Sequence, residues 1–180
     1  MLQSASKKRP TEEARNDYAT HSDFCAIFRE QLDSLFLLAL LLTGDELSAE
    51  KCFLTAFDIC IVGSVFKESA ASWSRRSVIK AAIRLMLPAP FDRSGSHVVG
   101  NHSDVNVDQD ASLKCVRELP PFDRFVFVMS VLERYSAHDC ALLLACSPAD
   151  ILPARIRALQ QISKGEKSYP SQSIGVSVLT

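Results

Sequence analysis

The sequence has no marked excess of charge of either sign. Lysine and arginine contribute 20 residues against 21 aspartates and glutamates, so the formal net charge over 180 residues is −1. Such a chain lacks the surplus of cations with which a polybasic protein coats nucleic acid, because that binding neutralises phosphates with Lys and Arg. A local basic face on one helix is still allowed. The hydrophobic fraction of 47% is typical of a globular protein and argues against wholesale disorder or a fibrous fold.

Long hydrophobic runs are also missing. The longest, Leu35 to Leu42, contains eight residues, whereas roughly 20 are needed to span a bilayer. Near the N-terminus, Lys7, Lys8 and Arg9 are followed by polar residues instead of an apolar core, so no secretory signal is predicted. We therefore expect a cytoplasmic protein without a membrane span, of a length that suits one ordinary domain or two small ones.

None of the six cysteines belongs to a Cys-x-x-Cys pair, and their spacing fits neither a zinc ribbon nor a disulfide scaffold. Several occupy apolar-periodic positions, so we interpret them as reduced thiols that act as small hydrophobes. Two small groups carry metal-ligand side chains, His97 with His102 and Asp104, and His138 with Cys140 and Cys146. We predict no metal at either, because the first lies in a stretch without periodicity and the second includes a cysteine that should face a helical core.

Enzyme motifs are absent as well. The chain contains no Gly-x-Ser-x-Gly, Walker loop, His-Glu-x-x-His or Gly-x-Gly-x-x-Gly pattern. The acidic pairs Glu12-Glu13 and Asp45-Glu46 lie in a tail and at a helix start, not across a cleft. The sequence therefore predicts a protein that is not an enzyme and uses no cofactor. A small helical enzyme would need an ordered pocket of convergent polar groups.

What the sequence does contain is helical periodicity. Apolar residues recur at spacings of three and four over 23–42, again from Leu47 to Cys60, and again over 69–87. Gly44 should end the first helix in a left-handed conformation, and Asp45 should cap the second. We predict an all-α fold from these patterns.

The helical patterns fall into two groups, which predict two small domains joined by a flexible linker. The expected boundaries are a mobile tail over 1–22, a helical unit over 23–87, a linker over 88–110, a second helical unit over 111–162 and a tail over 163–180. The second unit should hold helices over 111–119, 122–133, 136–144 and 147–162. The last tail is expected to be loose or a short strand.

The stretch from Ser136 to Ile162 predicts a helix-turn-helix. Ser136 should cap a short helix, and Ser147 should cap the next one, with Pro148 at its first position and Asp150 closing a Ser-x-x-Asp capping box. Two short helices joined this tightly cross at a steep angle, and the second can then enter a major groove. A packed hairpin without DNA binding remains the alternative.

Two segments resemble bacterial sigma factors of the extracytoplasmic-function type. The stretch VRELPPFDRFVFVMSVLERYSAHDCALLLACSP is similar to their C-terminal promoter-reading domain, with a Leu-Pro-Pro start, an apolar helix, a Tyr-Ser turn and a Cys-Ser-Pro start of the recognition helix. The earlier stretch LFLLALLLTGDELSAEKCFLTAF resembles the N-terminal sigma domain. Trp73 with Arg76 resembles the tryptophan-containing third helix of that domain. Together the matches cover about two thirds of the chain.

The resemblance implies that 23–87 binds the core of RNA polymerase and helps to open the promoter, while 111–162 contacts upstream duplex. The residues it assigns to polymerase binding are Glu50, Phe53 and Phe57. Those it assigns to DNA are Trp73, Arg75, Arg76 and Lys80 at the melted strand, and Ser147, Arg155 and Arg157 at phosphates. An anti-sigma protein would be a further partner. For the basic face around Trp73, the alternative is a solvated surface beside a core tryptophan.

The sequence departs from the family at both contact surfaces. Lys51, Leu54 and Thr55 stand where the family carries a carboxylate and a Gln-Glu pair. In the recognition helix, Asp150 and Pro153 replace residues that suit phosphate contact, and Pro153 should bend or break the helix at roughly 3 kcal/mol. A second hypothesis is therefore a degenerate sigma-like interaction module, which binds a protein partner or itself and no longer reads DNA.

Overall fold

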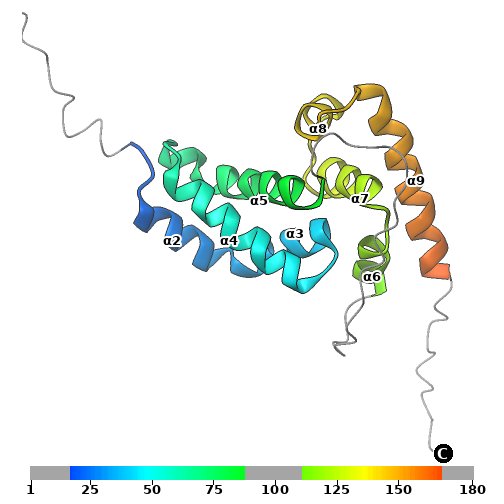
Figure 1. Ribbon diagram of the computed structural model, residues 1–180, viewed down its shortest axis with the longest axis horizontal. Coiled ribbons are helices and arrows are strands. Elements are labelled where there is room, and N and C mark those ends of the chain that lie inside the picture. Colours follow the sequence, from blue (N-terminus) through cyan, green and yellow to red (C-terminus); the bar gives the residue numbers. More distant parts are fainter. Residues whose placement is uncertain (1–16, 88–110, 168–180) are drawn as a thin grey trace, which may run out of the picture.

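The computed structural model describes residues 17–87 and 111–167, and in these ranges the chain is helical apart from turns and one isolated bridge between Tyr18 and Phe66 (Figure 1). The predicted all-α fold is confirmed. The predicted linker over 88–110, residues 1–16 of the first tail and residues 168–180 of the last lie outside the described residues.

The N-terminal unit contains α2 (His21–Glu30), α3 (Leu32–Thr43), α4 (Glu46–Val62), the short 3-10 helix η1 (Lys67–Ser69) and α5 (Ala70–Met86). Local sequence sets the ends. Thr20 and Asp23 form a capping box at α2, Gly44 ends α3 at φ 87°, and the Asp45 carboxylate accepts from the Ser48 amide at 2.8 Å. The predicted caps at Gly44 and Asp45 are therefore confirmed.

The prediction of one continuous helix over 23–42 is wrong. The backbone leaves helical angles at Gln31, which separates α2 from α3. Phe24 and Phe28 before the break and Leu35 and Leu38 after it are all buried in the same core. Apolar spacings of three and four continue through Gln31, so periodicity alone does not show the interruption.

Small side chains allow α4 to pack closely on α5. Ala49, Cys52, Ala56 and Cys60 recur along one face of α4 and are fully buried. The Cys52 thiol donates to the Val78 carbonyl at 3.4 Å. These cysteines act as small hydrophobes, as predicted, and all six cysteines are free thiols.

Burial should make the core thiols unreactive. Loss of solvation raises the pKa of Cys52 to about 12 from 9.0 and that of Cys140 to about 11. At pH 7 the thiolate fraction of Cys52 is then about 1,000-fold below that of an ordinary thiol. We expect a thiol reagent to label the half-exposed Cys25 and Cys146 first, and Cys52 only on unfolding. Mass spectrometry of labelled peptides measures the rates, and equal rates for Cys25 and Cys52 would contradict the burial.

The C-terminal unit contains α6 (Ala111–Arg117), α7 (Pro121–Phe127), the π-helix η2 (Val128–Leu132), α8 (Ala137–Leu144) and α9 (Pro148–Lys167). A single helix over 122–133 was expected, but α7 widens into η2, and the Glu133 amide bonds the Val128 carbonyl five residues back. At the same place the Ser130 hydroxyl donates to the Val126 carbonyl at 2.7 Å. This wider turn still buries Val128 and Met129, so the apolar pattern conceals it.

The last helix is longer than predicted. It continues through Pro153 to Lys167, so the expected break is absent, and the prediction of a loose tail is wrong over 163–167. Pro153 removes one backbone hydrogen bond near the start of α9, while the buried Ile151, Ala154 and Ala158 hold the helix against α6, α7 and α8. Packing on one face outweighs the local cost of the proline. Within the described ranges, no helix combines the length and the apolar character needed to cross a membrane.

Candidate functional site

A buried guanidinium joins the two helical units. Arg124 of α7 donates to the Leu42 carbonyl at 3.1 Å and to the Thr43 carbonyl at 2.9 Å, at the C-terminus of α3, and to the Arg117 carbonyl at 2.8 Å. A helix C-terminus leaves carbonyls unsatisfied and carries partial negative charge, so it can hold a cation without a carboxylate. Burial lowers the pKa of Arg124 to about 10, which leaves the group charged at neutral pH.

Glycine is required beside this guanidinium. A Cβ atom at Gly44 would lie 2.6 Å from Nη1 of Arg124, and its φ of 87° is one that side chains rarely adopt. Arg117 of α6 adds a further bond between the two units, because its Nε donates to the Gly44 carbonyl at 2.9 Å. The helices α6 and α7 therefore pack on α3, and the cores of the two units form one hydrophobic cluster.

Of the residues predicted to meet a melted DNA strand, Arg75 is partly exposed and is held by other side chains of the chain. Its guanidinium binds both carboxylate oxygens of Glu133, at 2.9 Å from Nε to Oε2, and its Nη1 donates to the Ser34 hydroxyl at 2.9 Å. Hydrogen bonding to Glu133 is also the main reason why the pKa of Arg75 lies above its usual value. Arg75 thus links α5 to the end of η2, 58 residues along the chain.

The predicted DNA-facing residues Trp73, Arg76 and Lys80 lie on α5, as the sequence implies. Lys80 Nζ lies 4.8 Å from the centre of the Trp73 ring, in a cation–π contact. Trp73 is half-buried against the core, and within the described residues its Nε1 is buried without a hydrogen-bond partner. Arg76 is exposed. One face of the tryptophan ring therefore already carries an ammonium group.

The helices α8 and α9 form a tight pair. Ser136 accepts from the Asp139 amide at 3.1 Å, and Ala145 ends α8 in a left-handed conformation at φ 50°. Ser147 precedes α9, and its amide donates to the Asp150 carboxylate at 3.1 Å. Its hydroxyl accepts from the Ala149 amide at 3.3 Å instead of from position 150, so the capping box has only one of its two predicted bonds.

The two arginines predicted to hold phosphates on α9 differ in what they contact. Arg157 forms a two-bond ion pair with Asp123 of α7, at 2.6 and 3.0 Å. Arg155 is exposed and forms no ion pair within the described ranges. Much of the outward surface of α9 is apolar, because Leu152, Ile156 and Leu159 are all exposed.

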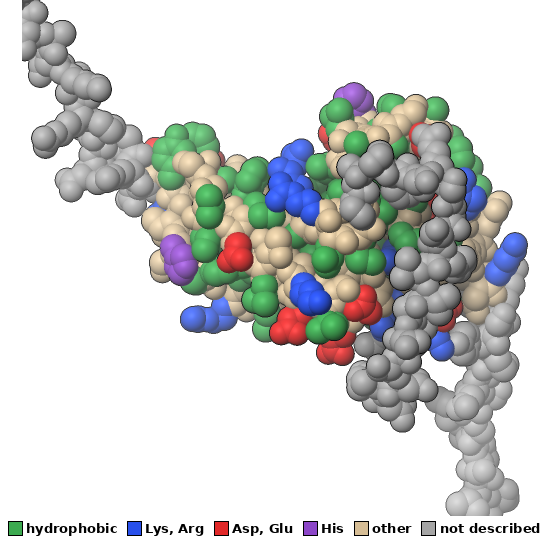
Figure 2. All heavy atoms as spheres, in the orientation of Figure 1, with side chains coloured by type: hydrophobic (Ala, Val, Ile, Leu, Met, Phe, Trp, Pro, Cys, Tyr) green, Lys and Arg blue, Asp and Glu red, His purple; other side chains and the backbone are tan. Residues whose placement is uncertain are grey.

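The predicted polymerase-binding residues of α4 also differ in exposure and in what they contact. Glu50 is exposed, whereas Phe53 and Phe57 pack edge-on against Phe28 of α2, with ring centres 5.2 and 5.1 Å apart. The outward surface of α4 instead presents Leu47, Leu54, Ile61 and Val62, which sequence analysis missed as contact residues. Figure 2 shows acidic, basic and hydrophobic side chains interleaved on the part of the surface that α4 crosses.

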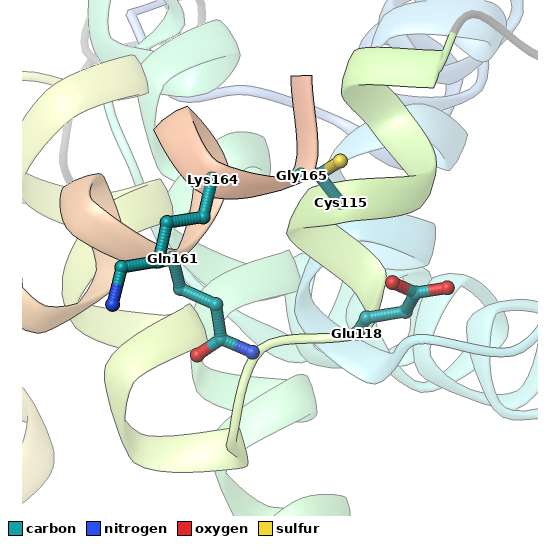
Figure 3. Close-up of a pocket in the computed structure, with 5 residues that line it drawn as sticks. All are labelled: Cys115, Glu118, Gln161, Lys164 and Gly165. Carbon is teal, nitrogen blue, oxygen red and sulfur yellow. The ribbon is translucent and has the colours of Figure 1, made fainter. Parts of the chain in front are cut away.

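A small open hollow of about 270 Å³ lies between α6 and α9 (Figure 3). Cys115 of α6 and Glu118, just after that helix, line it on one side, and Gln161, Lys164 and Gly165 line it from α9. A Cβ atom at Gly165 would lie 2.6 Å from the Cys115 sulfur, so the glycine permits the close approach of the two helices. In the described part of the chain no three His, Cys, Asp or Glu side chains are grouped as metal ligands, while His97, His102 and Asp104 lie outside it.

Comparison with models of known protein families finds none that matches this chain, and comparison with curated protein sequences finds no match either.

Proposed function

We propose that this chain is a sigma-factor-like transcription initiation protein that binds the core of RNA polymerase and contacts promoter DNA. The observation that carries the proposal is the tight α8–α9 pair, in which α9 starts at Pro148 and packs on the core by one face only. This is the arrangement that the resemblance to the promoter-reading domain of sigma factors implies. The proposed role is non-catalytic.

In this proposal the first turn of α9 approaches the DNA backbone. The N-terminus of a helix carries partial positive charge, which suits phosphate oxygens. The Ser147 and Ala149 amides at the start of α9 are bonded within the first turn, to the Asp150 carboxylate and the Ser147 hydroxyl. Ser147, Pro148 and Ala149 are exposed there, and Arg155, which has no ion pair among the described residues, adds a guanidinium about two turns further along. The charges of Arg157 and Arg75 are already paired with Asp123 and Glu133, so Arg155 is the better candidate on α9 for a phosphate contact.

On the other unit, the exposed face of α4 is the proposed polymerase contact. It presents Glu50 and Asp58 together with Leu47, Leu54 and Ile61, and no other described element covers these side chains. Phe53 and Phe57 support the helix from behind through their contacts with Phe28. Their part in polymerase binding is then to position α4, whereas Glu50 would touch the partner.

The DNA contact predicts a specific effect of Arg155→Ala. We expect the chain, together with bacterial core polymerase, to shift a randomised duplex library in a gel. Removing this one phosphate contact should reduce the slope of log affinity against log salt concentration by about one. Arg29→Ala removes an exposed arginine from α2, far from α9 in sequence, and is the matched control. An equal salt dependence of binding for the wild type and Arg155→Ala, or no gel shift at all, would contradict the DNA contact.

A second candidate function is an interaction module that binds protein instead of DNA. The apolar outward residues Leu152, Ile156 and Leu159 favour it, because a helix that reads a major groove needs polar side chains at such positions. Binding to neither polymerase nor DNA, together with self-association, would support this candidate over the first.

A further inference from the structure

An exposed apolar row runs the length of α4. Leu47, Leu54 and Ile61 are seven residues apart, which places them in one line on this 17-residue helix, and their exposed fractions are 63%, 56% and 36%. We call these three residues the α4 stripe. Glu50 and Asp58 flank it, and neither forms an ion pair within the described ranges. The stripe is therefore an apolar surface with acidic edges.

A second exposed apolar row lies on α9. Leu152, Ile156 and Leu159 are spaced by four and three, so they share one face, with exposed fractions of 53%, 45% and 44%. We call them the α9 stripe. Arg155, three residues after Leu152 and four before Leu159, lies beside it without an ion pair in the described part of the chain. Arg157 lies on another side of the helix and is paired with Asp123. This stripe is an apolar surface with one basic edge.

We propose that the α4 stripe of one copy of this chain docks on the α9 stripe of a second copy. Both stripes are apolar, so burying them against each other removes hydrocarbon from water. Pairing α4 with α9 also brings the carboxylates of α4 to the guanidinium of Arg155, whereas α4 on α4 or α9 on α9 would bring like charges together, which costs free energy. Lys51 reduces the negative charge of the α4 face, but Glu46, Glu50 and Asp58 outnumber it.

The proposed contact joins two different surfaces. Two copies close into a dimer only if both stripes of each copy meet their counterparts at once; otherwise each copy keeps one free stripe, and association continues into a chain or a larger ring. One helix face on another is small beside the roughly 1,600 Å² of a standard interface, so we expect weak, concentration-dependent association. Self-association stands independently of the proposed function. If that function holds as well, association covers both the polymerase face and the DNA face and competes with initiation.

The test uses sedimentation of the full chain over a range of concentrations. The average mass of the wild type should rise above the monomer mass of 19.9 kDa. Leu54→Lys and Ile156→Lys each place an ammonium group at the centre of one stripe, and each variant alone should remain monomeric. Mixed in equal amounts, the two variants retain one intact stripe of each kind. They should form a dimer of one copy of each that grows no further.

Leu32→Lys, at another exposed leucine, is the matched control and should associate like the wild type; circular dichroism checks that all variants keep their helices. A wild type that stays monomeric at every concentration would overturn the proposal. Dimers of Leu54→Lys alone would show that α9 docks on α9. Dimers of Ile156→Lys alone would show that α4 docks on α4. Either result would overturn the proposed docking of α4 on α9. A separate polymerase pull-down reports on the proposed function, so the two failures are distinguishable.

Discussion

Replacing Arg124 with alanine is expected to lower the free energy of unfolding by about 3–5 kcal/mol, because three inward-facing carbonyls lose their donor and a cavity opens where the side chain lay. The side chain is only 5% exposed, and its acceptors at Leu42 and Thr43 belong to the other helical unit. The loss should therefore weaken the contact of α7 with α3 before it weakens either unit alone. Urea unfolding followed by circular dichroism measures the change.

The matched control for this prediction is Arg84→Ala, which removes an exposed arginine from α5 and should change stability by less than about 0.5 kcal/mol. The loss in the free energy of unfolding for Arg124→Lys should lie between those for Arg84→Ala and Arg124→Ala, because one ammonium group cannot bond three carbonyls as the fork of a guanidinium does. A loss below about 1 kcal/mol for Arg124→Ala would show that the two units do not depend on this residue.

The second large effect concerns the ion pair between α7 and α9. Arg157→Ala should lower the free energy of unfolding by about 2–3 kcal/mol, because it leaves the carboxylate of Asp123 buried and unpaired. The two side chains are unequal, at 55% exposed for Arg157 and 9% for Asp123. Asp123→Asn removes the charge instead and leaves only an exposed arginine without its partner. It should therefore cost less, about 1 kcal/mol.

A double-mutant cycle separates this explanation from a general loss of packing. With Asp123→Asn already in place, Arg157→Ala should cost far less than it does in the wild type, because no buried charge remains to be left unpaired. Thermal unfolding of the four chains gives the coupling. Equal costs of Arg157→Ala in both backgrounds would mean that Arg157 stabilises α9 by some means other than Asp123.

Much of the fold could be predicted from the sequence, because the signals that set it are local. The spacing of apolar residues, the glycine at position 44 and the caps at Asp45 and Ser136 each act within a few residues. The break at Gln31 and the π-helix after Phe127 could not be predicted, because both keep the apolar residues facing the core. The predicted break at Pro153 is wrong because the prediction considered only the lost backbone hydrogen bond, and not the packing of α9 against three other helices.

The candidate site was predicted less well, because long-range partners decide which charged residues are free. Arg75 and Arg157 appeared as free cations in the sequence, but their carboxylate partners lie 58 and 34 residues away. Arg124 was missed altogether. Its signal was the pair of charged residues Asp123 and Arg124 inside the otherwise apolar stretch Phe122–Met129, where a charge has to find a buried partner. Glu50 and Arg155, which the sequence did single out, are exposed in the structure.

The proposed binding of RNA polymerase core through the outward face of α4 can be measured in a pull-down with bacterial core polymerase. We expect the polymerase to retain the wild-type chain and to bind Glu50→Lys about tenfold more weakly, since the substitution reverses a contact charge. Glu30→Lys makes the same change at an exposed position of α2 and should bind like the wild type. No retention of the wild type, or equal binding of the wild type and both variants, would show that α4 does not bind the polymerase through this face.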